Sequence, residues 1–362
     1  MSSSAFITPP TRRPWRPLRP AISTKGRYKM FISKQIYAVD HHHGQASRTI
    51  LSGYPTILGK TMPEKAAYYL EHLSWIHESL IREPRGHRNM LGSILTEPVT
   101  EGAAYGVLFN HAFGLFDSCG DSTFATASAL VELGYVPAVE SVTHFVLDTV
   151  LGPIKIEVQI EDGVVKEARF ENVPSYDVGS TRIQVPELGV VNLDVGFGGQ
   201  YHGFVDADTI GIKVDRKNEA ALVSAANQIW AAGGRKIDIR DPENGKEITL
   251  NLVSFISRNE EANSYSVAHV YPPGRMGRTP GGTGTSALMG LLAARGQYDP
   301  SKTFTMRSVI GLDFTGTGTP LAMPNGAKAI RPKLGTKSYM MGVQHFVIDP
   351  ADPFKHGFVL EG

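Results

Sequence analysis

Two segments that lie far apart in the sequence each lead from a polar or glycine-rich loop into an apolar helix that ends at a glycine. The first runs through residues 116–134 and the second through residues 277–296. Glycine is favoured directly after a helix because it readily adopts the left-handed conformation. The first turn of a helix presents unpaired N–H groups and the positive end of the helix dipole, and both attract anions. The sequence therefore predicts two anion-binding helix ends in one fold.

The glycine spacing of the second loop does not fit a nucleotide-binding motif. No lysine follows Gly284, the last glycine of the loop, as a phosphate-binding loop requires. The loop also lacks a clear βαβ unit with an acidic residue about 20 positions further on. We therefore exclude nucleotide binding.

Hydrophobic periodicity predicts the same order of elements twice. Strands and a helix over 62–83 precede the first loop and its helix, and strands and a helix over 218–232 precede the second. Because 362 residues exceed the usual size of a single domain, two domains with a ligand cleft between them are expected. The clearest strands are expected at 35–39, 47–51, 105–109, 143–149, 154–160 and 164–170.

The helix over 62–83 begins at a capping box and carries an apolar stripe. Thr61 and Glu64 have the spacing of that box, and the stripe is expected to face the core. Two histidines of this helix, His72 and His77, stand next to glutamates and are expected to face solvent.

The only cysteine of the chain, Cys119, stands at the start of the first helix. A thiol at a helix N-terminus is favoured as the thiolate, which is the form that accepts a proton. Cys119 is therefore the candidate base. The alternative is a buried, inert cysteine that packs as a small hydrophobic residue.

Composition restricts the partners of this chain. With 36 basic and 35 acidic residues there is no net field for nucleic acid or a membrane surface. No apolar run approaches the roughly 20 residues that span a bilayer. A single cysteine fits a reducing compartment, so a cytoplasmic location is expected. Residues 1–29 are basic, contain prolines and lack acidic residues, so they are expected to form a disordered extension, with organelle targeting as the alternative. For the whole protein, a homodimer is also left open.

Three adjacent histidines, His41–His43, follow Asp40 and raise the question of a metal site. Consecutive side chains on a strand point to opposite faces, and no further cysteine or acidic ligand follows at a suitable spacing. We expect neither a metal nor another cofactor.

The two loops and several further motifs resemble the proline racemase family. That family has M-C-G-H at the first loop and D-R-S-P-C-G-T-G-T-S-A at the second. Its motifs E-P-R-G-H-x-D-M, N-V-P-S-F, D-I-A-F-G-G and D-P-x-D-P-F-x-x-G-F have counterparts here in the same order. The matching segments are Glu83–Met90, Val173–Ser175, Asp194–Gly199 and Asp349–Phe358.

The resemblance implies an α/β (α+β) fold of two similar, diaminopimelate-epimerase-like domains. Each domain would be a curled sheet around a central helix, with the active site in the cleft between them. Residues 30–145 plus about 330–362 would form the first domain, with strands near 338–348 returning to it, and residues 146–329 the second.

The resemblance also implies cofactor-independent chemistry at the α-carbon of an imino or amino acid. Cys119 would be the catalytic base. Backbone N–H groups of both loops, rather than arginines, would hold the substrate carboxylate. The substrate-binding residues would be Gly120, Asp121, Ser122, Gly281, Gly282, Thr283 and Gly284.

The chain departs from the family at three of its site positions. Gly281 stands at the second cysteine, Asp121 at the histidine after the first cysteine, and Gly277 at the aspartate of the second motif. The last two positions contact the imino nitrogen in the family. Asp121 could replace them as the single acidic partner of the substrate nitrogen, or it could repel the substrate carboxylate.

The loss of the second cysteine leaves three functions open. The dehydratase branch of the family needs one cysteine, with a threonine at the second position, so dehydration of trans-3-hydroxy-L-proline with Cys119 as single base is the first hypothesis. Thr279 and Thr283 are neighbours that could assist the leaving hydroxyl. A proline racemase or hydroxyproline 2-epimerase is the second hypothesis, and it needs another group on the second face. A changed substrate or an inactive member of the family is the third.

Overall fold

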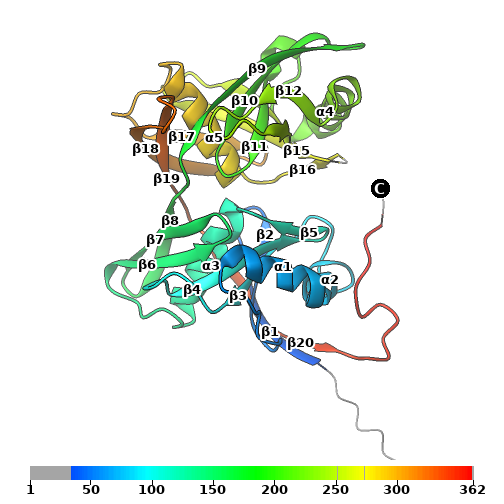
Figure 1. The fold of residues 1–362 in the computed structure, drawn as a ribbon, viewed down its shortest axis with the longest axis vertical. Coiled ribbons are helices and arrows are strands. Elements are labelled where there is room, and N and C mark those ends of the chain that lie inside the picture. Colours follow the sequence, from blue (N-terminus) through cyan, green and yellow to red (C-terminus); the bar gives the residue numbers. More distant parts are fainter. Residues whose placement is uncertain (1–33, 251, 273, 361–362) are drawn as a thin grey trace, which may run out of the picture. The chain divides into compact units, whose positions relative to one another are not determined.

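The computed structural model describes residues 34–250, 252–272 and 274–360. These residues belong to one compact unit (Figure 1). The expected extension over residues 1–29 lies outside the described residues.

The first half of the chain holds strands, two consecutive helices and then the helix that follows Cys119. All its predicted strands are present. Its elements are β1 (Lys34–His42), β2 (Ala46–Ser52), α1 (Met62–His72), α2 (Trp75–Ile81), β3 (Leu91–Thr96), β4 (Tyr105–His111), β5 (Gly114–Phe116), α3 (Gly120–Glu132), β6 (Ser141–Thr149), β7 (Gly152–Glu161) and β8 (Val164–Glu171).

The second half repeats this order and adds the final strand. Its elements are β9 (Ser175–Val185), β10 (Gly189–Phe197), β11 (Tyr201–Asp206), the short 3-10 helices η1 (Ala207–Ile210) and η2 (Arg216–Asn218), α4 (Glu219–Gly233), β12 (Lys236–Arg240), β13 (Glu247–Thr249), β14 (Leu252–Arg258), β15 (Ser264–Tyr271), β16 (Arg275–Met276), α5 (Gly282–Ala294), β17 (Phe304–Ser308), β18 (Asp313–Ala322), β19 (Lys328–Thr336) and β20 (Tyr339–Ile348).

Strand pairing makes the repeat clear. In the first half β1 pairs antiparallel with β2, β2 parallel with β3, β3 antiparallel with β4, and β4 parallel with β6. The second half shows the same alternation: β10 pairs antiparallel with β11, β11 parallel with β14, β14 antiparallel with β15, and β15 parallel with β17. The repeated order expected from periodicity is therefore a repeat of topology.

Each half encloses one central helix. Helix α3 packs on β2, β3 and β8, and α5 packs on β9, β10 and β19 (Figure 1). The strands around α5 close into a ring, because β19 pairs with both β18 and β9. Both helices are buried over nearly their whole length, which fits their many small and apolar residues and the absence of lysine and arginine from both. The predicted fold class is confirmed.

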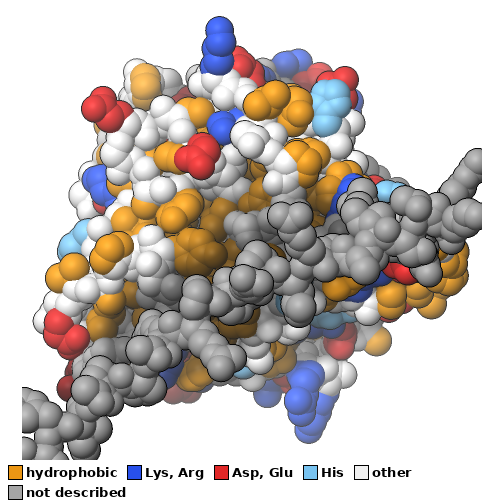
Figure 2. All heavy atoms as spheres, turned by 90° about the horizontal axis from the view of Figure 1, so that it is seen from below, with side chains coloured by type: hydrophobic (Ala, Val, Ile, Leu, Met, Phe, Trp, Pro, Cys, Tyr) orange, Lys and Arg blue, Asp and Glu red, His pale blue; other side chains and the backbone are white. Residues whose placement is uncertain are grey.

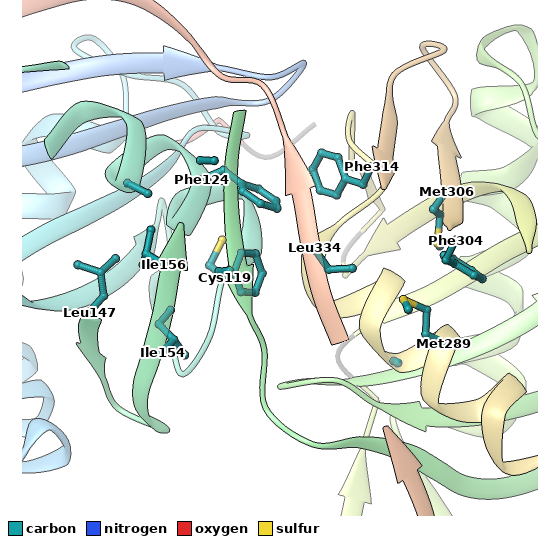
Figure 3. Packing of buried hydrophobic residues seen from close by; sticks show 14 of the residues in the cluster. Cys119, Phe124, Leu147, Ile154, Ile156, Met289, Phe304, Met306, Phe314 and Leu334 are labelled. Atoms are coloured by element: carbon teal, nitrogen blue, oxygen red, sulfur yellow. The ribbon is translucent and has the colours of Figure 1, made fainter. Parts of the chain in front are cut away.

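One hydrophobic cluster spans the two halves. Figure 3 shows it running from Cys119 and Phe124 beside α3, past Leu334 on β19, to Met289 on α5. β8 also pairs with β19, so the two sheets are joined by hydrogen bonds. The domain boundaries expected from the sequence stay a prediction.

The segment 62–83 differs from its prediction in one respect. It forms two helices, with a break at Leu73, instead of one. The break turns His77 inward, where its Nδ1 lies 3.0 Å from the hydroxyl of Tyr69 and its side chain is buried. The prediction that His77 faces solvent was wrong because a single helical period was extended across the break. His72 stays exposed, with its Nε2 3.6 Å from a carboxylate oxygen of Glu71.

The final strand, β20, returns to the first half and pairs antiparallel with β1, as the resemblance implied. It carries exposed apolar side chains, and Figure 2 shows hydrophobic side chains on the surface seen from that side. None of the helices in the described part of the chain is long and apolar enough to cross a membrane.

Candidate active site

The N-terminal turns of α3 and α5 lie against each other. A methyl group added to Gly120 would be 2.5 Å from the Cα of Gly282, and one added to Gly282 would be 2.6 Å from the Cα of Gly120. Only two glycines allow the backbones to approach this closely. The first-turn N–H groups of both helices, which have no partner within their own helix, are thereby brought to one place. The two predicted loops do meet.

Cys119 is the N-cap residue of α3 and is buried. Its Sγ lies 3.4 Å from the hydroxyl of Ser122, which in turn lies 3.2 Å from the hydroxyl of Ser47. Burial, followed by the negative charge of Asp121, raises the pKa of the Cys119 thiol to about 12. The expectation of a stable thiolate is therefore wrong for the ligand-free protein, because loss of solvation outweighs the helix dipole.

Asp121 is held from both halves of the molecule. Its Oδ1 accepts hydrogen bonds from Nε2 of His43 at 3.0 Å and from the hydroxyl of Thr279 at 2.8 Å. The other ring nitrogen of His43, Nδ1, lies 3.1 Å from the hydroxyl of Ser338. All four side chains are buried. This arrangement fixes the carboxylate of Asp121 directly after the cysteine.

A buried network of two imidazoles supports the loop before α5. The carbonyl oxygen of Pro280 accepts from Nε2 of His269 at 2.6 Å, which assigns the proton to that nitrogen. Nδ1 of His269 then accepts a hydrogen bond from the hydroxyl of Ser254 at 2.8 Å. That hydroxyl accepts a hydrogen bond from Nδ1 of His202 at 3.1 Å. Nε2 of His202 in turn accepts a hydrogen bond from the hydroxyl of Thr283 at 3.0 Å. Burial lowers the pKa of both imidazoles, so both are neutral.

Gly281, at the second cysteine position, has a backbone conformation that suits glycine. Its φ is 70°, in the left-handed region. A Cβ at this position would lie 2.8 Å from both Cδ2 and Nε2 of His269. The imidazole of His269 therefore occupies the space where a side chain at position 281 would begin.

A cavity of about 20 Å³ lies beside Asp121, with Gly277 and Thr279 in its wall. This volume holds about one water molecule, so a substrate ring enters only if the walls move. A second cavity, of about 420 Å³, shares the side chains of Tyr271 and Arg275 with the first. The two cavities are therefore neighbours.

The structure brings the predicted site residues of both loops together and adds others. Sequence reasoning missed Tyr271 and Arg275, and it considered His43 only as a metal ligand. The pKa of Tyr271 is raised by burial and by the nearby Asp121 and Cys119, which places its phenol at the site. Nothing in the sequence spacing relates these residues to Cys119, because strand pairing brings them there. The substrate-binding roles of the two loops stay predictions.

The raised pKa of Cys119 leads to a testable result. We expect iodoacetamide to alkylate the folded, ligand-free protein at pH 8 far more slowly than it alkylates free cysteine, because very little thiolate is present. The rate should rise steeply as the pH approaches the pKa of about 12. A folded-state pKa above the unfolded value means that the neutral thiol stabilises the fold below pH ~9 and that this stabilisation is lost as the pH rises. Intact-protein mass spectrometry measures the rate without ambiguity, since the chain has one cysteine.

The same protein unfolded in urea is the control for this experiment. Its cysteine should react at the ordinary rate. Rapid alkylation of the folded protein at pH 8 would contradict the assigned direction of the pKa shift.

Comparison with known proteins agrees with this geometry. The family model described as proline racemase matches residues 38–359. The proline racemase of Clostridioides difficile is 35% identical over 336 residues, covering 92% of this chain and 100% of that protein. The trans-3-hydroxy-L-proline dehydratase of Bacillus thuringiensis is 30% identical over 334 residues, covering 91% and 100%. A crystal structure of a hydroxyproline epimerase from Agrobacterium vitis with bound trans-4-hydroxy-L-proline superimposes with a TM-score of 0.83 at 25% identity, covering 90% of this chain and 95% of that one. With matches over nearly the whole described chain in sequence and in fold, this protein belongs to the proline racemase family.

Proposed function

We propose that this protein removes the α-proton of a proline- or hydroxyproline-like imino acid with Cys119 as the base. The observation that carries the proposal is that the only thiol of the chain lies where the N-terminal turns of two helices meet. The first-turn N–H groups would hold the substrate carboxylate and stabilise the charge that develops as the proton leaves. The buried carboxylate of Asp121 would accept a hydrogen bond from the N–H group of the substrate.

Substrate binding would also create the thiolate. The charge of Asp121 is the second cause of the raised pKa of Cys119. A cationic substrate nitrogen beside Asp121 offsets this charge and so lowers the pKa of the thiol. The base would therefore form only when its substrate is bound.

We further propose that the reaction is the dehydration of trans-3-hydroxy-L-proline. Cys119 takes the α-proton, the double bond between the α-carbon and C3 forms as the C3–O bond breaks, and the hydroxyl leaves as water with the proton that Cys119 removed. The resulting enamine tautomerises to the cyclic imine. Elimination needs one base, and Gly281 offers no side chain on the second face. A relative named as a dehydratase of this substrate supports the proposal.

Epimerisation is the second candidate, because of His269. Its imidazole lies where a side chain at position 281 would begin. His269 would return a proton from Nε2 only after this N–H leaves the carbonyl oxygen of Pro280 and Nδ1 takes a proton from Ser254 in its place. A proton removed by Cys119 and a proton returned from His269 would invert the α-carbon. The relatives named proline racemase and hydroxyproline epimerase support this alternative.

One experiment separates the two reactions. The protein is incubated in parallel with L-proline, trans-4-hydroxy-L-proline and trans-3-hydroxy-L-proline in D₂O, and α-proton exchange, optical rotation and the cyclic imine are followed. We expect the cyclic imine to form from trans-3-hydroxy-L-proline. We expect inversion of the α-carbon of L-proline and of trans-4-hydroxy-L-proline to be much slower. Rapid inversion without imine would reject dehydration. The variant His269→Gln would then lose inversion but keep α-proton exchange, if His269 is the second acid.

A further inference from the structure

The two carboxylate oxygens of Asp121 have different surroundings. Oδ1 accepts two hydrogen bonds, one from Nε2 of His43 at 3.0 Å and one from the hydroxyl of Thr279 at 2.8 Å. The other oxygen, Oδ2, has no hydrogen-bond donor among the described residues. Asp121 also lies in the wall of the small cavity of about 20 Å³. The carboxylate therefore keeps one acceptor for a ligand.

His43 is itself held in one place. Its side chain is fully buried, and its other ring nitrogen, Nδ1, lies 3.1 Å from the hydroxyl of Ser338. The ring centroid of Phe124, on α3, lies 5.9 Å from that of His43, and the ring centroid of Phe314, on β18, lies 5.8 Å from it. The imidazole is therefore fixed by contacts from both halves of the chain.

Packing alone does not require a histidine at position 43. An apolar ring of similar size would fit beside the two phenylalanine rings, whereas a buried imidazole needs a partner for each of its nitrogens. An ionised carboxylate has no proton to give, so Nε2 of His43 is the donor and Oδ1 of Asp121 is the acceptor. The property that distinguishes histidine from an apolar ring here is thus the N–H group that it directs at Asp121.

A carboxylate with one oxygen bound to two donors cannot turn freely. Its second oxygen then points in one direction before any substrate arrives, and such prior arrangement lowers the barrier of a reaction. Asp121 lies in the first turn of α3, two residues after Cys119. The direction of Oδ2 therefore sets how far a nitrogen bound to it lies from the thiol.

We propose that His43 is a positioning residue of this site. Together with Thr279 it holds Oδ1 of Asp121, so that Oδ2 accepts the N–H of the substrate and places the α-carbon before Cys119. His43 itself does not touch the substrate. The inference rests on the proposed function for the identity of the group that Oδ2 accepts.

Two inert ligands test the role of Oδ2 without turnover. Pyrrole-2-carboxylate and furan-2-carboxylate are planar, carry no α-proton and differ in one ring position, which is an N–H group in the first and an oxygen in the second. Calorimetric titration should give a dissociation constant at least about tenfold lower for the pyrrole, because an N–H group bound to a carboxylate forms a charge-assisted hydrogen bond. In His43→Phe this preference should fall below about threefold, because a carboxylate that only Thr279 holds can turn.

The variant His43→Gln separates positioning from packing. Its amide nitrogen reaches close to the place of Nε2 and can donate to Oδ1, so the preference for the pyrrole should stay above about fivefold. With saturating trans-3-hydroxy-L-proline, α-proton exchange should slow by about 10- to 100-fold in His43→Phe and by less than about fivefold in His43→Gln. The midpoints of thermal unfolding should rank the two variants in the opposite order, because phenylalanine packs beside the two aromatic rings whereas glutamine buries an amide. A purely structural role of His43 would give the same rank in all three measurements.

His77→Phe is the matched control. His77 is also a buried imidazole, with its Nδ1 3.0 Å from the hydroxyl of Tyr69, but it lies on α2. This variant should lose stability and keep both the ligand preference and the exchange rate.

Equal affinity of the wild-type protein for the two ligands would overturn the inference, and so would the failure of both to bind. An unchanged preference in His43→Phe would overturn it as well, as would a His43→Gln protein that is as impaired as His43→Phe. Failure of the proposed function has a different signature, namely a preference for the pyrrole that His43→Phe abolishes, without α-proton exchange in any substrate.

Discussion

Replacing Cys119 by serine should reduce α-proton exchange by about 100- to 10,000-fold, the usual contribution of a general base. A serine hydroxyl is a far weaker acid than a thiol, so it does not supply the anionic base at neutral pH. The measurement is NMR detection of deuterium incorporation at the α-carbon of trans-3-hydroxy-L-proline in D₂O. The midpoint of thermal unfolding should change little, because the substitution only replaces the sulfur atom by a smaller oxygen atom. The hydroxyl of Ser122 stays within hydrogen-bond reach.

Ser128→Ala is the matched control for this variant. Ser128 lies on the same helix, is buried, and has no hydrogen-bond partner for its hydroxyl among the described residues. It should exchange the α-proton at the wild-type rate. Undiminished exchange in Cys119→Ser would remove Cys119 from the mechanism.

Gly120→Ala should cause the largest combined loss of stability and activity. The new methyl group would lie 2.5 Å from the Cα of Gly282 and 3.2 Å from the ring of Phe170. Backbone atoms cannot move aside as a flexible side chain does, so the helix ends must separate. We expect the free energy of unfolding to fall by about 1–3 kcal/mol, as for other overpacked sites. Activity should be lost as well, because Cys119 is the adjacent residue.

Denaturant titration followed by circular dichroism measures the stability change. Gly342→Ala on β20 is the control, because the nearest atom to its added methyl group is the end of the Gln344 side chain at 3.2 Å. That variant should change stability by less than about 0.5 kcal/mol, as surface substitutions usually do. A Gly120→Ala protein as stable and as active as the wild type would show that the two helix ends separate without loss.

The elements of this fold were predictable where the signal is local. The start of α1 at Thr61 and the glycine after α3 are set by capping within a few residues, and both were predicted from the sequence. The repeated order of strands and helices was equally visible. The break between α1 and α2 was missed because an apolar stripe continues across it.

The site was predictable in its two loops but not in its electrostatics. The pKa of Cys119 depends on its burial in the folded protein, and helix position alone gives the wrong direction. His43 and Arg275 reach the site through strand pairing with distant segments, so their spacing from Cys119 carries no signal. The departures from the family pattern at Asp121 and Gly281 are visible in the sequence, and in the structure His43 and Thr279 hold Asp121 while His269 lies beside Gly281. What replaces the lost groups required the three-dimensional structure.

The hydrogen bond between His43 and Ser338 joins residues 295 positions apart, and β20 completes the sheet on which His43 is carried. During synthesis the ribosome makes the Cys119 half first, yet that half lacks its last strand until almost the entire chain has emerged. Contacts so distant in sequence form late, because the entropy cost of closing a long loop comes before the contacts can stabilise the fold. The half that is translated first is therefore completed only when β20 has been made, and a chain that terminates before Ser338 lacks the hydrogen bond that holds His43 beside Asp121.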